Sequence, residues 1–165
     1  MKQQAAPGSR AVEPSAVRLA EFLSPHSVSL SLKATEKPQI LEELVSLLPI
    51  GDADRRIALE ILNQREAVGS TGIGMGVAIP HCRSTIFANL QIAFGRSPRG
   101  IAFQAVDRKR VQIFFLVVSP PIEVTNQYHA VLAAIVNATK DARARRRLLE
   151  VESAAEVRSI LSEAL

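Results

Sequence analysis

The spacing of apolar residues changes twice along the chain. Apolar residues recur at helical spacing between 35 and 66, in alternating or continuous runs between 77 and 118, and at helical spacing again from about 126 onward. Helices on both sides of a central group of strands are typical of layered α/β domains, in which helices cover a sheet. The pattern therefore predicts one α/β domain, and the sequence contains no internal repeat.

The first part of this pattern predicts two helices with one strand between them. The segment 17–24 is predicted to form a short helix that Pro25 ends, because proline cannot continue a helix. Polar and apolar residues alternate over 27–32, which indicates a strand of the edge type. A helix is then expected from Thr35, a residue suited to the N-cap, to about Leu48; its apolar stripe is Ile40, Leu41, Leu44, Val45 and Leu48.

The middle of the chain is predicted to supply another helix and most of the sheet. The helix starts at Asp52 or Asp54. Three strands follow, over 77–79, 89–95 and 111–118. The last is a continuous run of β-branched and aromatic residues, which suits a central strand buried on both faces.

The two ends of the chain complete the predicted organisation. A helix is expected over 126–139 and two more over 142–165. Residues 1–16 are polar and interrupted by proline and glycine, so we expect them to form a loose leader. The domain itself is predicted to comprise residues 17–165.

Composition narrows the class of protein. Of the 165 residues, 47% are apolar and 22% charged, as in ordinary soluble domains. The apolar runs are too short to span a bilayer, and the N-terminus lacks the apolar core of a signal peptide. The single cysteine, Cys82, excludes an internal disulfide and a multi-cysteine zinc site. We therefore expect a cytoplasmic protein with no membrane insertion.

The formal net charge of +4 does not by itself predict nucleic-acid binding. The densest basic run, over 141–150, mixes both signs at helical spacing, which is typical of a solvated helix face. Without tryptophan and with one tyrosine, the chain has few aromatic side chains that could stack on bases. We expect no nucleic-acid partner, although a basic surface can attract an acidic protein.

The candidate chemistry lies in a glycine-rich stretch, GSTGIGMGVAIPHC, over 69–82. Backbone N–H groups of such stretches often bind phosphate. This one matches neither a Walker loop, because no lysine follows its glycines, nor a dinucleotide-binding fingerprint, because a helix precedes it and valine occupies the last glycine position. The alternative is a glycine-rich turn that only permits positive φ.

The end of this stretch predicts phosphate chemistry. Pro80 holds Ile79 in an extended conformation and ends the strand, so that His81 is presented beside the loop. Arg65 and Arg83 flank this histidine and would neutralise phosphate oxygens better than they would serve a hydrolytic base. Neutral imidazole is also a good nucleophile near neutral pH.

The segment REAVGSTGIGMGVAIPH, over 65–81, resembles the active-site signature of phosphotransferase-system enzyme IIA domains of the fructose/mannitol superfamily. Its GSTGIG part is most similar to the nitrogen-regulatory branch, IIA-Ntr. The resemblance extends to LSPHSVSLSLKATEKPQILEEL near the start and RRRLLEVESAAEVRSIL near the end, and so covers about 17–165. It implies an α/β fold in which a mixed β-sheet is sandwiched between helices.

The resemblance also implies which residues act. The family's active histidine, which accepts phosphate from a phosphohistidine on a small HPr-like carrier, corresponds to His81. The family's arginine before the glycines corresponds to Arg65, where it would hold phosphate. Further phosphate contacts are expected from the motif glycines, Gly72, Gly74 and Gly76, and, because it flanks His81 in the sequence, from Arg83.

Two positions depart from the family's pattern. The family usually has glycine or alanine after the active histidine, where this chain has Cys82, which we expect to fill space rather than to have a redox role. The family's supporting histidine begins a helix. Apolar spacing puts Tyr128 at that position, with His129 about 100° round the helix, and both remain candidates. A phenol stays neutral near pH 7 and would stabilise phosphate less than an imidazolium.

The sequence thus predicts a phosphoryl-accepting regulatory component of a nitrogen-type phosphotransferase system. Its partners would be an HPr-like phosphocarrier as donor and regulatory target proteins. The alternatives are a sugar-transport IIA that passes phosphate to a IIB domain, and a protein-interaction module that is not phosphorylated. No cofactor is expected, and no metal, because His81, Cys82 and His129 have no fourth ligand at a characteristic spacing.

Overall fold

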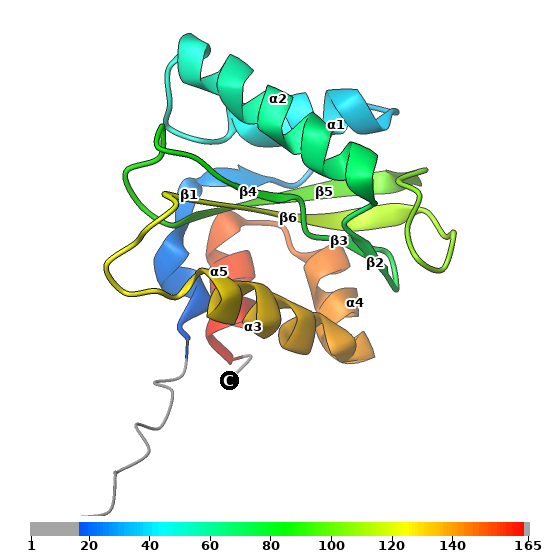
Figure 1. The fold of residues 1–165 in the computed structure, drawn as a ribbon. Helices are drawn as coiled ribbons and strands as arrows, with labels where there is room; N and C mark the ends of the chain where they lie inside the picture. Colours follow the sequence, from blue (N-terminus) through cyan, green and yellow to red (C-terminus); the bar gives the residue numbers. More distant parts are fainter. Residues whose placement is uncertain (1–16, 164–165) are drawn as a thin grey trace, which may run out of the picture.

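The computed structural model describes residues 17–163 as three layers, with a mixed β-sheet between two groups of helices (Figure 1). This arrangement confirms the predicted fold class. The leader expected over 1–16 lies outside the described residues. Within 17–163, none of the helices has the length and apolar character needed to cross a membrane.

The sheet has six strands in the order β1-β5-β6-β3-β2, with β4 also paired to β6. β5 and β6 are antiparallel, whereas β1 is parallel to β5, and both β3 and β4 are parallel to β6. Their bounds are β1 Leu23–Ser29, β2 Gly72–Gly74, β3 Val77–Ala78, β4 His81–Arg83, β5 Gln91–Ile101 and β6 Val111–Ser119.

Helices cover both faces of this sheet (Figure 1). One face carries α1 (Lys37–Ser46) and α2 (Asp52–Val68). The other carries α3 (Tyr128–Lys140), α4 (Ala142–Glu150) and α5 (Ala154–Glu163), together with the 3₁₀ helix η1 (Leu19–Phe22). The apolar stripe predicted for the helix from Thr35 to about Leu48 is buried in full. Its residues are each at most 1% exposed: Ile40, Leu41, Leu44, Val45 and Leu48.

The central strand is β6, as the sequence predicts. Eight of its nine residues are buried, because helices cover the strand on both faces and it pairs along both edges. Alternate residues enter the two cores: Phe114 and Leu116 face α1 and α2, while Phe115 and Val117 face α3 to α5. β6 therefore provides the rigid support on which β3 and β4 are placed.

β3 and β4 form one interrupted strand along the free edge of β6. Val77 pairs with Ile113 and His81 with Val117, so the direction along β6 is kept across the break. Pro80 lacks an N–H for the ladder but accepts a hydrogen bond from the Val117 N–H (2.9 Å). The strand therefore ends before Pro80, as predicted, and a second strand on the same edge, β4, begins directly after it at His81.

The beginning of the domain also differs from the prediction. The expected helix over 17–24 is a 3₁₀ turn of four residues, and the expected strand over 27–32 begins earlier, at Leu23. Pro25 lies within β1, where its missing N–H is tolerated because β1 is an edge strand. The N-cap of α1 is Glu36 rather than Thr35.

Candidate functional site

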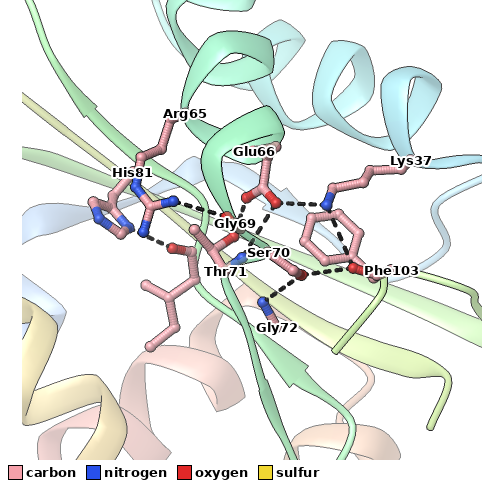
Figure 2. A network of polar contacts seen from close by, with 10 residues as sticks. Lys37, Arg65, Glu66, Gly69, Ser70, Thr71, Gly72, His81 and Phe103 are labelled. Atoms are coloured by element: carbon pink, nitrogen blue, oxygen red, sulfur yellow. Dashed lines mark hydrogen bonds and ion pairs between the residues drawn. The ribbon is translucent and has the colours of Figure 1, made fainter. Parts of the chain in front are cut away.

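His81 is the first residue of β4, and a backbone hydrogen bond fixes its ring. Its Nδ1 lies 2.7 Å from the carbonyl oxygen of Ile79 (Figure 2). Because a carbonyl can only accept, we assign the ring proton to Nδ1, which leaves a free lone pair on Nε2 in the neutral imidazole. Pro80 makes this bond possible by interrupting the strand between the two partners.

The His81 side chain lines a cavity of about 270 Å³ at the edge of the sheet, between the end of α2 and α3. Arg65 and Ser70 come from the end of α2 and the segment after it, and Leu132 and Val136 come from α3. The structure thus brings together two residues that the sequence separates by sixteen positions, Arg65 and His81. The cavity is mostly apolar, and its polar lining residues are Arg65, Ser70, Thr71 and His81.

Arg65 is held at the C-terminal end of α2. Its Nη1 donates to the carbonyl of Gly69 (2.8 Å), one of the carbonyls that the helix end leaves unpaired (Figure 2). This bond uses one of the five guanidinium N–H groups. Within 17–163 the guanidinium makes no other hydrogen bond, so its remaining N–H groups can reach an anion in the cavity.

Arg83 supplies a second cation on the same face of β4 as His81, because alternate strand residues point to the same side. Its guanidinium carbon lies 4.0 Å from the centre of the Tyr128 ring, and its Nη1 donates to the carbonyl of Pro121 (3.3 Å). Its Nε is buried and has no hydrogen-bond partner among residues 17–163. A buried donor without a partner is suited to receive an oxygen ligand.

Tyr128, not His129, lies next to the active-site candidate. The Tyr128 ring is buried and edge-on to the His81 ring, with 6.2 Å between ring centres. His129 is exposed, and its ring is 5.3 Å from that of Tyr128. Burial, and the charge on Cys82 when ionised, raise the pKa of Tyr128 to about 12, so the phenol keeps its proton at neutral pH.

The motif glycines form a β-hairpin rather than an open loop. Gly74 and Gly76 have φ values of +91° and +76° around the β2–β3 turn, and Gly76 accepts hydrogen bonds from Gln112 and Ile113. That contact is four to five residues along β6 from Val117, the partner of His81, which corresponds to roughly 13–16 Å. The structure therefore does not bring Gly74 and Gly76 to His81; the turn conformation explains these glycines.

Gly72 is required by a close approach. A Cβ at this position would lie 2.8 Å from both Cα and Cβ of Ala105, so no larger residue fits without a backbone shift. Its neighbour Thr71 lines the His81 cavity, but Gly72 itself packs against the segment after β5. The three glycines thus set the course of the hairpin, and the structure gives them no contact with the cavity.

A buried polar network that the sequence did not predict supports the segment leading to the hairpin (Figure 2). The Glu66 carboxylate pairs with the Lys37 ammonium (2.6 Å) and accepts hydrogen bonds from the N–H and hydroxyl of Thr71. The Ser70 hydroxyl donates to the carbonyl of Phe103 (2.6 Å) and accepts from the N–H of Gly72. The network ties α1, α2 and the hairpin together beside the cavity.

Cys82 points away from His81, into the core below α1 and α2. Its burial raises the pKa of the thiol to about 12, so that it stays protonated and unreactive. This geometry agrees with the expected space-filling role. Within 17–163, no three histidine, cysteine or acidic side chains are close enough together to hold a metal ion.

We predict that native Cys82 resists alkylation. At pH 8 the reaction with iodoacetamide, followed by intact mass, should be about a thousandfold slower than in the urea-unfolded chain, because the thiol pKa falls from about 12 to 9.0 on unfolding. By the same shift, folding stability should decrease as pH rises above 9, where the unfolded thiol loses its proton and the folded one keeps it. Comparable rates in both states would contradict the buried position.

Comparison with known proteins decides the family. The family of "Phosphoenolpyruvate-dependent sugar phosphotransferase system, EIIA 2" matches residues 21–164, nearly the whole described domain. The chain belongs to this family. The EIIA 2 match includes every residue of the His81 cavity.

Relatives of this EIIA 2 chain place it in the nitrogen-regulatory branch. A nitrogen regulatory protein of Bradyrhizobium diazoefficiens is 29% identical over 87% of this chain and 94% of its own. The crystal structure of the nitrogen regulatory protein IIA-Ntr of Neisseria meningitidis is 32% identical, with a TM-score of 0.80 over 87% of this chain and 98% of that one. These matches support a regulatory component of phosphotransferase type.

The EIIA 2 chain is also similar to part of a longer protein. The fructose-specific EIIABC component of Bacillus subtilis is 30% identical over 89% of this chain. The chain spans only 23% of that protein's length.

Proposed function

We propose that this chain is a phosphohistidine carrier that accepts a phosphoryl group on Nε2 of His81 from the phosphohistidine of an HPr-like protein. The observation that carries the proposal is the bond from Nδ1 to Ile79, which leaves Nε2 as the nucleophile in the cavity that Arg65 also lines. Arg83, two residues along β4, packs on the neighbouring Tyr128 ring. Membership of the family supports the donor class, because proteins of this family belong to phosphotransferase systems.

The transfer is a direct exchange between two imidazoles. The Nε2–P bond forms as the N–P bond of the donor breaks, while the proton on Nδ1 stays in its bond to Ile79. Arg65 and Arg83 face the negative charge of the phosphoryl group, and in such transfers positioning and charge stabilisation account for most of the rate. Both cations are fixed before the reaction, Arg65 by Gly69 and Arg83 by Pro121 and Tyr128.

The experiment is phosphorylation of the purified chain by phosphoenolpyruvate and purified donor proteins, followed by intact mass. We expect one phosphate per chain, lost on mild acid treatment and transferable back to the donor. A chain that gains no mass while the donor itself is phosphorylated would contradict the proposal.

A second candidate function rests on the similarity to the fructose-specific EIIABC component. In that case the phosphoryl group would pass from His81 to a sugar-specific IIB domain rather than end in a regulatory form. Incubation of the phosphorylated chain with fructose-type IIB distinguishes the two functions. We expect retention of phosphate on this chain, and fast, complete transfer would instead favour the transport role.

The position of Tyr128 leads to a prediction about the transfer rate. Tyr128→Phe should slow phosphorylation about 2- to 10-fold, the loss expected when one neutral hydrogen bond is removed. The effect should be no larger, because the phenylalanine ring can still pack against the Arg83 guanidinium. The matched change His129→Ala should leave the rate within twofold, since its side chain is exposed. Rapid-quench phosphorylation measures both rates. A larger effect at His129 would reverse the assignment.

A further inference from the structure

A second cavity, of about 610 Å³, lies at the other end of the sheet. The loop over 31–35, between β1 and α1, forms one wall, and residues 97–101 at the end of β5, together with Arg110, form the other. Arg96, next to this wall, pairs with Ile113 of β6, whereas His81 pairs with Val117. These two positions are four residues apart along β6, so the distance between them is roughly 13 Å. The two cavities share no residue.

The charged side chains that line this cavity are all positive. Lys33, Arg99 and Arg110 line it, and no acidic side chain among the described residues does. The nearby Glu43 uses its carboxylate on the backbone N–H groups of Lys33 and Ala34. Within 17–163, the three cations form no ion pair. An anion could therefore approach them without displacing a carboxylate.

The Ser97 hydroxyl lies at the wall of the cavity. Ser97 is only 3% exposed and lines the cavity, and its hydroxyl can donate a hydrogen bond to a group bound there. The apolar side chains of Leu32 and Ile101 line the same space.

The walls of the cavity are fixed before any ligand binds. The loop over 31–35 is held by Glu43 and by the hydrogen bond from the Leu32 N–H to the carbonyl of Arg96 (2.8 Å). On the other side, Arg110 donates through Nε and Nη2 to the carbonyl of Gly100 (3.2 and 2.6 Å), which leaves its Nη1 for another acceptor. Preformed walls lower the entropic cost of binding.

We propose that this cavity is a binding site for a small organic anion. Its carboxylate or phosphate group would accept hydrogen bonds from the Ser97 hydroxyl and from Lys33, Arg99 and Arg110, and its apolar part would pack on Leu32 and Ile101. The volume lies within the usual range of small-ligand sites, about 300–1,000 Å³. The site is independent of the phosphoryl chemistry proposed for His81.

The test is an NMR titration of the full-length, ¹⁵N-labelled chain with phenyl phosphate and benzoate, and with phenol as the uncharged counterpart. Amide signals over 65–83 report separately any anion that binds in the first cavity, which Arg65 and His81 line. We expect saturable shifts of backbone amide signals in 31–35 and 97–101 with at least one of the two anions, and none with phenol. The anion that binds with the higher affinity shows whether the site prefers a phosphate or a carboxylate group.

Variants separate this site from general attraction to a basic protein. Lys33→Gln combined with Arg99→Gln should weaken binding at least about tenfold, and Ser97→Ala should weaken it several-fold. Arg143→Gln combined with Arg146→Gln removes the same charge from α4, a helix on the opposite face, and should change the affinity by less than twofold. The proposal is overturned if no saturable shift occurs, if phenol binds as well as the anions, or if both double variants weaken binding equally.

Discussion

His81→Gln is expected to take up no acid-labile phosphate, with a rate at least about three orders of magnitude below that of the unchanged chain. Glutamine keeps a polar side chain of similar length but has no nucleophilic nitrogen. The Nε2 lone pair that the bond to Ile79 leaves free is therefore lost, while Arg65, Arg83 and the cavity remain. Intact mass after incubation with phosphoenolpyruvate and donor proteins measures the effect.

His129→Gln is the matched control for this experiment. It removes an imidazole only 5.3 Å from the Tyr128 ring, but from an exposed position. We expect it to be phosphorylated at nearly the normal rate, and far-UV circular dichroism to show that both variants are folded. If His81→Gln still gained phosphate while His129→Gln did not, the acceptor would be His129 rather than His81.

Glu66→Gln is expected to lower the free energy of unfolding by about 3 kcal/mol, because it leaves the Lys37 ammonium buried without its counter-charge. The two side chains are 5% and 16% exposed, so water screens the pair little. The Glu66 carboxylate also holds Thr71, which lines the His81 cavity. Urea unfolding followed by far-UV circular dichroism suits a chain without tryptophan.

Two further variants make this prediction specific. Lys37→Met combined with Glu66→Gln should lose less stability than the two single changes added together, because neither charge is then left alone. Glu21→Gln breaks the exposed pair with Arg18, in which the side chains are 62% and 73% exposed, and should cost about 0–1 kcal/mol. Additive effects of Lys37→Met and Glu66→Gln, or an equal cost at Glu21, would show that the buried pair has no special role.

Much of the fold could be predicted because hydrophobic periodicity reports burial directly. The continuous apolar run of β6 is central and buried on both faces, and the stripe of α1 faces the core. The sequence predicts a strand that begins at residue 27, whereas β1 begins at Leu23. The difference arises because Pro25 is a helix breaker in sequence but is tolerated on a sheet edge that only the tertiary fold creates. The strands β3 and β4, with two and three residues, are too short for hydrophobic periodicity to show where one ends and the other begins.

The candidate site was predictable only in part. Apolar spacing along α3 favoured Tyr128 over His129, and the structure places Tyr128 beside His81. The pairing of Lys37 with Glu66 joins two helices across 29 positions, and nothing local in the sequence marks it. The glycines gave a misleading signal, because a hairpin with positive φ and a phosphate-binding loop require the same residue.

The most direct test of the central claim is the position of the phosphate on the histidine ring. NMR of the phosphorylated chain with ¹⁵N-labelled histidine distinguishes the two ring nitrogens by their coupling to phosphorus and to the ring protons. We predict a single phosphohistidine at His81, with phosphorus on Nε2 and the proton on Nδ1 retained in its bond to Ile79. Phosphate on Nδ1, or on His26 or His129, would contradict the proposed role of the Ile79 carbonyl and of His81.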